Sequence, residues 1–203
     1  MTDISVIIPC HNLEPYIERC LNSILRQDYD KEKYEILVIF DSCTDRTEEI
    51  VKRILENSES NYKMYNANVK RAGLARNIGL ENAAGKYIYF IDGDDYLIDD
   101  SALTEMLRTS EITGYPVVYQ ERFESDCKVV DEEAIWRYFY QSEIIGETRF
   151  SSKELNEDWE FVRKIKEKAD YRETGIKKAL YHYTYPRKDS ITDQYRSMMK
   201  REV

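Results

Sequence analysis

Three aspartates lie within four consecutive residues of this sequence, directly after a short apolar and aromatic run. Asp92, Asp94 and Asp95 follow residues 87–91, whose composition is typical of a buried strand. Carboxylates this close together repel one another unless a positive charge lies among them. Their oxygens suit a hard divalent cation such as Mg²⁺ or Mn²⁺, especially one that also binds diphosphate oxygens. A solvated acidic turn explains the same residues at this point, because Asp and Gly are common in turns.

A second acidic pair stands much later in the chain. Glu157 and Asp158 precede Phe161, Val162 and Ile165, which have the spacing of one apolar helix face. A carboxylate at the start of a helix could accept a proton as a general base. It could equally stabilise the first helical turn through the helix dipole. The pattern by itself leaves both interpretations open.

The elements expected to position these groups alternate in the first half of the chain. Apolar runs predict strands over residues 4–9, 35–40, 62–65 and 86–91, and apolar residues at helical spacing predict a helix after each of the first three. Repeated strand–helix units predict a mainly parallel sheet with helices on both faces. Ligands bind such sheets outside the carboxyl ends of the strands. We therefore expect one cleft to contain the polar residues that follow these strands, namely His11, Asn12, Asp41, Asp92 and Asp94.

The second half of the chain is less regular. Its patterns predict helices over 102–110, 132–141 and 158–169 and strands over 117–123 and 181–185. A break near residues 99–101 separates the two halves. We therefore expect a single domain over 1–203, with a nucleotide-type half over 1–98 and a variable half over 99–203.

The composition limits the classes of partner. With 30 basic and 39 acidic residues the formal net charge is −9, which argues against a nucleic-acid partner because such binding needs a basic face. No apolar stretch approaches the roughly 20 residues of a membrane span, and the N-terminus lacks the pattern of a signal peptide. The four cysteines match no metal or redox motif. We expect a cytoplasmic protein with no transmembrane segment, for which peripheral contact with a membrane stays open.

Several segments, in the right order, resemble the family-2 glycosyltransferases of GT-A fold. They are Ser5-Val-Ile-Ile-Pro-Cys-His-Asn12, Leu37-Val-Ile-Phe-Asp-Ser-Cys-Thr-Asp45, Gly73-Leu-Ala-Arg-Asn-Ile-Gly79 with 87–97, and Asn156-Glu-Asp-Trp-Glu-Phe161 with Leu180-Tyr-His-Tyr183. The resemblance implies an α/β fold of GT-A type. This is a Rossmann-like, mainly parallel sheet flanked by helices, with a small C-terminal region on the acceptor side. It also implies transfer of a sugar from a nucleoside diphosphate donor with inversion at the anomeric carbon.

The resemblance implies roles for individual residues. Asp41 would accept a hydrogen bond from the nucleobase, commonly uracil, and Asp92 would contact the ribose or the metal shell. Asp94 would ligate Mn²⁺ or Mg²⁺. Asp158 would be the general base, with Glu157 as the neighbour able to replace it. The remaining candidates for donor binding are Pro9, His11, Asn12, Glu14, Arg71, Arg76 and Gly93.

Structural alternatives accompany several of these roles. Asp41 could cap the next helix turn, and Asp95 could hold the acidic loop instead of binding metal. Arg71 and Arg76 could pair with donor phosphates or form salt bridges within the protein. His182 could join the metal site, although its alternation with tyrosines favours a structural place in a strand.

The expected function is metal-dependent transfer of a hexosyl-type sugar, with a UDP-sugar as the favoured donor and a saccharide or lipid-linked saccharide hydroxyl as acceptor. The alternative is a catalytically silent module that binds a nucleotide or glycan. Two departures from the family pattern motivate it, because Phe40 replaces one of two usual aspartates and the region between Asp95 and Glu157 is short, but the intact Asp92, Asp94 and Asp158 count against it. A sugar nucleotidyltransferase is disfavoured because the loop over 9–15 has no glycine with which to bind a triphosphate.

Overall fold

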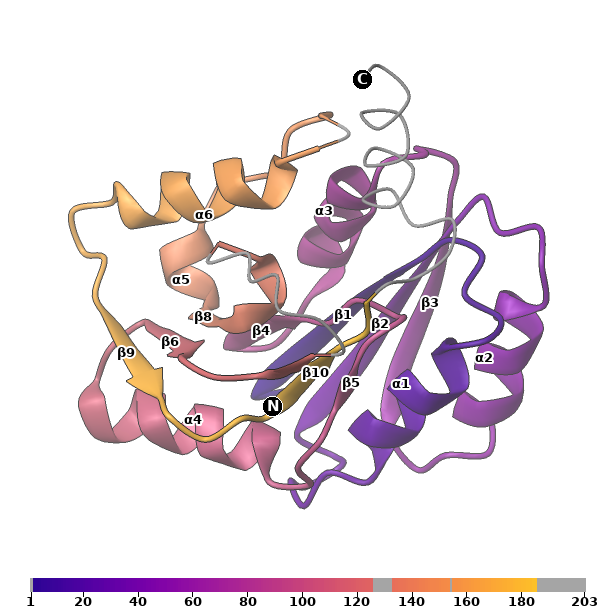
Figure 1. Ribbon diagram of the computed structural model, residues 1–203, viewed down its shortest axis with the longest axis horizontal. Helices are drawn as coiled ribbons and strands as arrows, with labels where there is room; N and C mark the ends of the chain where they lie inside the picture. Colours follow the sequence, from indigo (N-terminus) through magenta and orange to yellow (C-terminus); the bar gives the residue numbers. More distant parts are fainter. Residues whose placement is uncertain (1, 126–132, 154, 186–203) are drawn as a thin grey trace.

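The computed structural model describes residues 2–125, 133–153 and 155–185 of the 203-residue chain. Within these residues, seven strands form one sheet in the order β3-β2-β1-β4-β8-β6-β9 (Figure 1). Strands β1 to β4 are parallel neighbours, β8 is antiparallel to both β4 and β6, and β9 is parallel to β6. The strands are β1 (Ile4–Cys10), β2 (Tyr34–Asp41), β3 (Asn61–Ala67), β4 (Tyr87–Phe90), β6 (Val117–Gln120), β8 (Tyr138–Gln141) and β9 (Glu173–Ile176).

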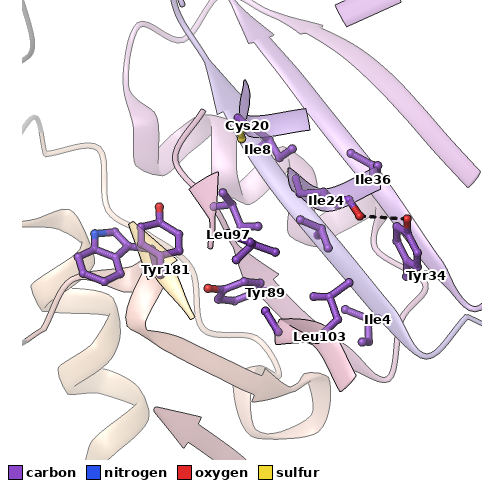
Figure 2. Close-up of a cluster of buried hydrophobic side chains, with 14 of the residues drawn as sticks. Ile4, Ile8, Cys20, Ile24, Tyr34, Ile36, Tyr89, Leu97, Leu103 and Tyr181 are labelled. Atoms are coloured by element: carbon purple, nitrogen blue, oxygen red, sulfur yellow. Dashed lines mark hydrogen bonds between the residues drawn. The ribbon is translucent and has the colours of Figure 1, made fainter. Parts of the chain in front are cut away.

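Helices cover both faces of this sheet (Figure 1). Strand β1 is buried on both sides, so its side chains divide alternately between two apolar cores. Val6 and Ile8 pack with α1 (Ile17–Leu25), α2 (Thr47–Leu55) and α4 (Ala102–Thr113), and Figure 2 shows part of this core. Ile7 packs on the opposite face, which is covered by α3 (Ala72–Asn82), α5 (Ser142–Ile145) and α6 (Glu157–Lys166).

A small second sheet lies beside the end of β4. Its three strands have the order β5-β10-β7, with bounds β5 (Tyr96–Leu97), β7 (Glu124–Ser125) and β10 (Tyr181–Tyr183). Tyr181 pairs with Leu97 across β10 and β5, and both side chains belong to the first core, where Figure 2 labels them. The loop that carries the three aspartates therefore connects the large sheet to the small one.

The predicted α/β fold with a mainly parallel sheet is confirmed, but one predicted helix is wrong. Of the range 132–141, the described residues form a short 3₁₀ turn (η1, Ile135–Arg137) followed by strand β8. Phe139 stacks on Tyr87 of the neighbouring strand with ring centroids 5.1 Å apart. These cross-strand aromatic contacts outweigh the helical pattern of the segment.

The element bounds have one consequence for membranes. Among the described residues, no helix combines the length and the apolar character that a membrane crossing requires.

Candidate active site

The site lies where β1, β2 and β4 end at the same edge of the sheet. Cys10 pairs with Phe40 and Ile7 pairs with Phe90, so the loops that follow the three strands meet there. The exposed His11 ring reaches from the first loop to the second, where its Nδ1 lies 2.6 Å from the carbonyl oxygen of Asp41. A carbonyl only accepts, so Nδ1 is the protonated ring nitrogen in this contact. The predicted convergence of these strand ends is therefore present.

Asn12 and Glu14 add further contacts between the loop after β1 and the loop after β2. Asn12 has a left-handed backbone (φ 51°), and its Oδ1 accepts hydrogen bonds from the backbone and hydroxyl of Thr44. Glu14 accepts hydrogen bonds from the backbone and the guanidinium of Arg46. These bonds from Arg46 hold the pKa of the Glu14 carboxyl below its usual range. Both predicted donor-side residues thus make contacts that shape the loops, and their contact with a donor stays a prediction.

Asp41 is buried and gathers backbone donors around its carboxylate. Its Oδ1 accepts the N–H groups of Val69 and Lys70 at 2.9 Å each, and its Oδ2 accepts the N–H of Arg71 at 3.0 Å. These three residues directly precede α3. The alternative that Asp41 has a structural, capping role is thus partly right. Asp41 organises the start of α3 and not the turn that follows β2. Its contact with a nucleobase stays a prediction.

Within the acidic loop after β4, the aspartates have different surroundings. The Asp95 side chain is buried at 1% exposure, where both carboxylate oxygens accept hydrogen bonds, from the Tyr181 hydroxyl and the Thr184 N–H at 2.7 Å each. Burial, with Asp94 and Asp92 nearby, raises the pKa of Asp95. Asp92 and Asp94 are partly exposed. Asp95 therefore holds the loop, as its structural alternative predicted.

Gly93 is required for packing inside the protein. A Cβ built on Gly93 would come within 2.6 Å of the Leu13 side chain and 3.2 Å of the Ile17 side chain. The absence of a side chain at Gly93 therefore allows close packing against Leu13, in the loop after β1, and Ile17, the first residue of α1. Approach of the backbone to a donor remains untested.

Arg76 connects the two acidic motifs. Its guanidinium donates to Asp92 Oδ1 at 2.7 Å and to Glu157 Oε1 at 3.1 Å, and the side chain is only 4% exposed. Figure 1 shows α3, which carries Arg76, beside α6, which carries Glu157. Its position follows from the small residues of α3, since a Cβ at Gly73 would clash with Glu157. Direct binding of donor phosphates by Arg76 stays a prediction; its observed contacts are two carboxylates.

Asp158 lies in the first turn of α6, next to this bridge. Desolvation by the surrounding protein raises its pKa to about 7; Arg76 opposes the rise, and the charges of Glu157 and Asp92 add to it. The side chain keeps part of its surface accessible to solvent. A partly exposed carboxylate with a pKa near neutrality can gain and lose a proton at working pH.

The other candidates take up separate places. Pro9 is the penultimate residue of β1, and Arg71 lies at the start of α3 with its Nη1 donating to the carbonyl of Lys70. His182 lies on β10, where its ring stacks on Tyr96 at 4.6 Å. This placement agrees with a structural role for His182, and the described residues contain no group of three or more His, Cys, Asp or Glu side chains arranged to hold a metal ion.

The carboxylate oxygens of the acidic loop still suit a hard cation that takes its other ligands from a substrate. Asp92 and Asp94 offer only oxygen ligands at the end of β4, as Mg²⁺ and Mn²⁺ prefer. Two protein carboxylates completed by diphosphate oxygens are a usual arrangement for Mg²⁺ in phosphate chemistry.

Several residues of the site were missed by sequence reasoning. Arg19 on α1 donates to the carbonyl of Asp94, Tyr181 and Thr184 bind Asp95, and Val69 binds Asp41. Tyr181 belongs to a segment that the resemblance had singled out, but nothing in the sequence identifies the partner of its hydroxyl. Arg19 lies in an ordinary amphipathic helix and gives no signal at all.

Comparisons with known proteins cover nearly the whole chain. The sequence model of glycosyl transferase family 2 matches residues 5–187. The poly(ribitol-phosphate) beta-N-acetylglucosaminyltransferase TarS of Staphylococcus aureus is 36% identical over 97 residues, which make up 48% of this chain and 17% of that protein. The GalNAc(5)-diNAcBac-PP-undecaprenol beta-1,3-glucosyltransferase of Campylobacter jejuni is 27% identical, with 95% of this chain and 68% of that protein covered. The chain thus spans a small part of TarS and about two thirds of the second relative.

Solved structures share the fold. The crystal structure of Staphylococcus aureus TarS 1-349 in complex with UDP-GlcNAc has a TM-score of 0.83 at 23% identity, covering 94% of this chain and 61% of that one. A mannosyltransferase from Pyrobaculum calidifontis, in complex with GDP-Man and Mn²⁺, has a TM-score of 0.79 at 19% identity, covering 96% of this chain and 60% of that one. At these identities the likeness concerns the fold.

Proposed function

The chain belongs to glycosyl transferase family 2, and from this premise we propose that it transfers a sugar from a nucleoside diphosphate sugar to an acceptor hydroxyl. The observation that supports the proposal best is the Arg76 bridge. It brings Asp92, which follows β4, and Glu157, which neighbours Asp158, into one cluster although Glu157 lies 81 positions from Arg76 in the chain. A donor-side carboxylate and a candidate base are thereby held at one site.

Asp158 is the general base in this proposal. Its carboxylate takes the proton of the acceptor hydroxyl while that oxygen forms a bond to the anomeric carbon of the sugar. The bond from this carbon to the diphosphate oxygen breaks, and the electron pair leaves with the nucleoside diphosphate. Attack from the side opposite the leaving group inverts the anomeric centre. Glu157 is the weaker candidate for the base because Arg76 already binds its carboxylate.

Asp94 and Asp92 would hold the divalent metal ion. A bound Mn²⁺ or Mg²⁺ supplies Lewis-acid stabilisation of the charge that develops on the diphosphate. Arg76 holds Asp92 in place through the ion pair between its buried guanidinium and Asp92 Oδ1. Metal dependence is part of the proposal, and the division into a donor half over 1–98 and an acceptor half over 99–203 belongs to it as well.

The relatives indicate the chemical class of the substrates. TarS has been solved with UDP-GlcNAc, and the Campylobacter jejuni relative is named for glucosyl transfer to a saccharide on PP-undecaprenol. We propose a UDP-sugar as donor and a saccharide or lipid-linked saccharide as acceptor for this chain. We also propose a cytoplasmic location for the protein.

Nucleotide binding is the first test of this function. We expect UDP with Mn²⁺ to raise the melting temperature of the wild-type protein more than GDP, CMP or TDP does, and we expect Asp94→Asn to abolish the metal-dependent part. The exposed Asp28→Asn variant is the matched control for loss of one charge. Stabilisation by none of the four nucleotides would contradict the proposal. Binding without turnover of any UDP-sugar would favour the silent module.

A further inference from the structure

Four residues make hydrogen bonds that hold the acidic loop after β4 in place, and none of the comparisons gives them a role. We call Arg19, Asp95, Tyr181 and Thr184 the loop clasp. Asp95 accepts hydrogen bonds from Tyr181 and from the backbone of Thr184, and Arg19 Nη2 donates to the Asp94 carbonyl at 3.2 Å and to the Thr184 hydroxyl at 2.9 Å. The clasp joins residues of α1 and β10 to the loop that carries both proposed metal ligands.

Tyr181 is the central member of the clasp. Its hydroxyl donates to Asp95 Oδ2 at 2.7 Å and accepts the N–H of Asp92 at 3.3 Å, so one oxygen connects two residues of the loop. The ring is fully buried and stacks on Trp136 with centroids 4.5 Å apart and planes 3° apart. Figure 2 shows Tyr181 against this indole at the margin of the apolar core. The aromatic packing therefore fixes where the hydroxyl lies.

Arg19 is the exposed member of the loop clasp. Its guanidinium lies 4.2 Å from the centroid of the Tyr96 ring, which in turn stacks on His182. The flat guanidinium suits such stacking while it donates in its own plane to Asp94 and Thr184. Arg19 contacts only the backbone of the loop in these bonds, so it supports the loop without occupying a carboxylate.

We propose that Tyr181, acting through Asp95 and the Asp92 backbone, is a positioning residue that holds Asp92 and Asp94 ready for the metal and diphosphate of the donor. This inference rests on the proposed function. Ligand carboxylates bind a metal well only when neighbouring groups fix their orientation, and loss of such a supporting contact costs about 10-fold or more in affinity. Without the Tyr181 hydroxyl, the buried Asp95 carboxylate lacks one of its two hydrogen bonds and the loop loses its register against β10.

Tyr181→Phe removes the hydroxyl and keeps the stacked ring. Its matched control is Tyr34→Phe, because Tyr34 is equally buried and its hydroxyl also bonds, to the Ile24 carbonyl and to Ser60, but away from the site (Figure 2). Hydrogen exchange of the peptide over 91–97 is measured first, without ligand. We expect faster exchange in Tyr181→Phe and wild-type exchange in Tyr34→Phe.

Binding of UDP with Mn²⁺ by titration calorimetry is then compared in the same variants. We expect about 10-fold weaker binding for Tyr181→Phe and less than 2-fold change for Tyr34→Phe, with no difference between the variants for UDP without metal. Unchanged exchange, or unchanged affinity in the presence of faster exchange, would overturn the positioning role. Faster exchange in a protein whose wild type binds no nucleotide would support the clasp and contradict the proposed function, so the two failures are distinguishable.

Discussion

Two carboxylates of the candidate site, one at the end of β2 and one at the start of α6, show how differently one fold treats the same group. Asp41, at the end of β2, has three backbone N–H donors around it at 2.9–3.0 Å. Asp158, at the start of α6, lies among Glu157 and Asp92 with Arg76 as the opposing charge, and burial raises its pKa to about 7. The first environment fixes the residues that precede α3. The second makes ionisation costly, which is the condition for proton transfer near neutral pH.

The comparison depends most on Arg76, because its positive charge offsets the acidic cluster at Asp158. We expect Arg76→Gln to lower the free energy of unfolding by about 3–5 kcal/mol, since Asp92 and the buried Glu157 lose their partner. Chemical denaturation measures this. The control is Arg53→Gln, whose ion pair with Glu18 is exposed and should be worth about 1 kcal/mol or less. Equal losses of stability in the two variants would show that the Arg76 bridge contributes no more than an exposed ion pair.

The reactive side of the comparison is tested by Asp158→Asn. We expect transfer to fall about 10²-fold or more, because Asn cannot accept the proton of the acceptor hydroxyl, while binding of UDP with Mn²⁺ stays at the wild-type level. Steady-state transfer rates and calorimetry measure the two effects. Glu157→Gln is the companion variant: a larger loss of transfer there, at matched stability, would move the base to Glu157.

The role of Asp41 in organising the residues before α3 is tested by Asp41→Asn. The new amide can present only one acceptor oxygen to the three N–H groups before α3, so we expect about 1–3 kcal/mol of lost stability. Thermal or urea unfolding measures it, and Asp28→Asn, which alters an exposed carboxylate, is the control with a change near zero. Wild-type stability in Asp41→Asn would show that the loop does not depend on this carboxylate.

A gradual effect is the pH dependence of stability at Asp158. Its folded pKa, about 7, lies above the ordinary value of 3.8, so the folded state holds the proton more tightly than the unfolded state. The resulting stabilisation is complete below about pH 4 and is lost as the pH rises through 7, at no more than about 1.4 kcal/mol per pH unit. We therefore expect the melting temperature of Asp158→Asn, relative to wild type, to rise between pH 5 and pH 8. A constant difference across this range would contradict the raised pKa.

The rate of transfer should depend on the same pKa of Asp158, but it should rise with pH where the stability falls. Asp158 accepts a proton only when it is ionised, so the rate should increase with pH up to about 7 and then level off. In Arg76→Lys, which keeps a positive charge near Asp158, the midpoint should move less than in Arg76→Gln, where it should move upward. Transfer rates from pH 5 to pH 9 measure both midpoints.

Different parts of the molecule were predictable to different degrees. The strands over 4–9 and 35–40 and the meeting of their ends follow from apolar runs and from the rule that parallel strands present their carboxyl ends together. The segment over 132–141 was mispredicted because its described residues owe their extended form to neighbouring strands β4 and β6, which no local pattern reveals. The proposed role of Tyr181 was out of reach for the same reason, since its partner Asp95 lies 86 positions away.

The sequence by itself determined the order of strands and helices in the first half and the positions of the carboxylates, because periodicity and turn chemistry are local properties of the chain. Only the tertiary structure decided what each carboxylate does. It directed Asp95 inward to Tyr181, paired Asp92 with Arg76, and left Asp158 in surroundings that disfavour its charge. The reason is physical: the state of a carboxylate depends on desolvation and on charges within a few ångströms, and those neighbours are brought together by folding alone.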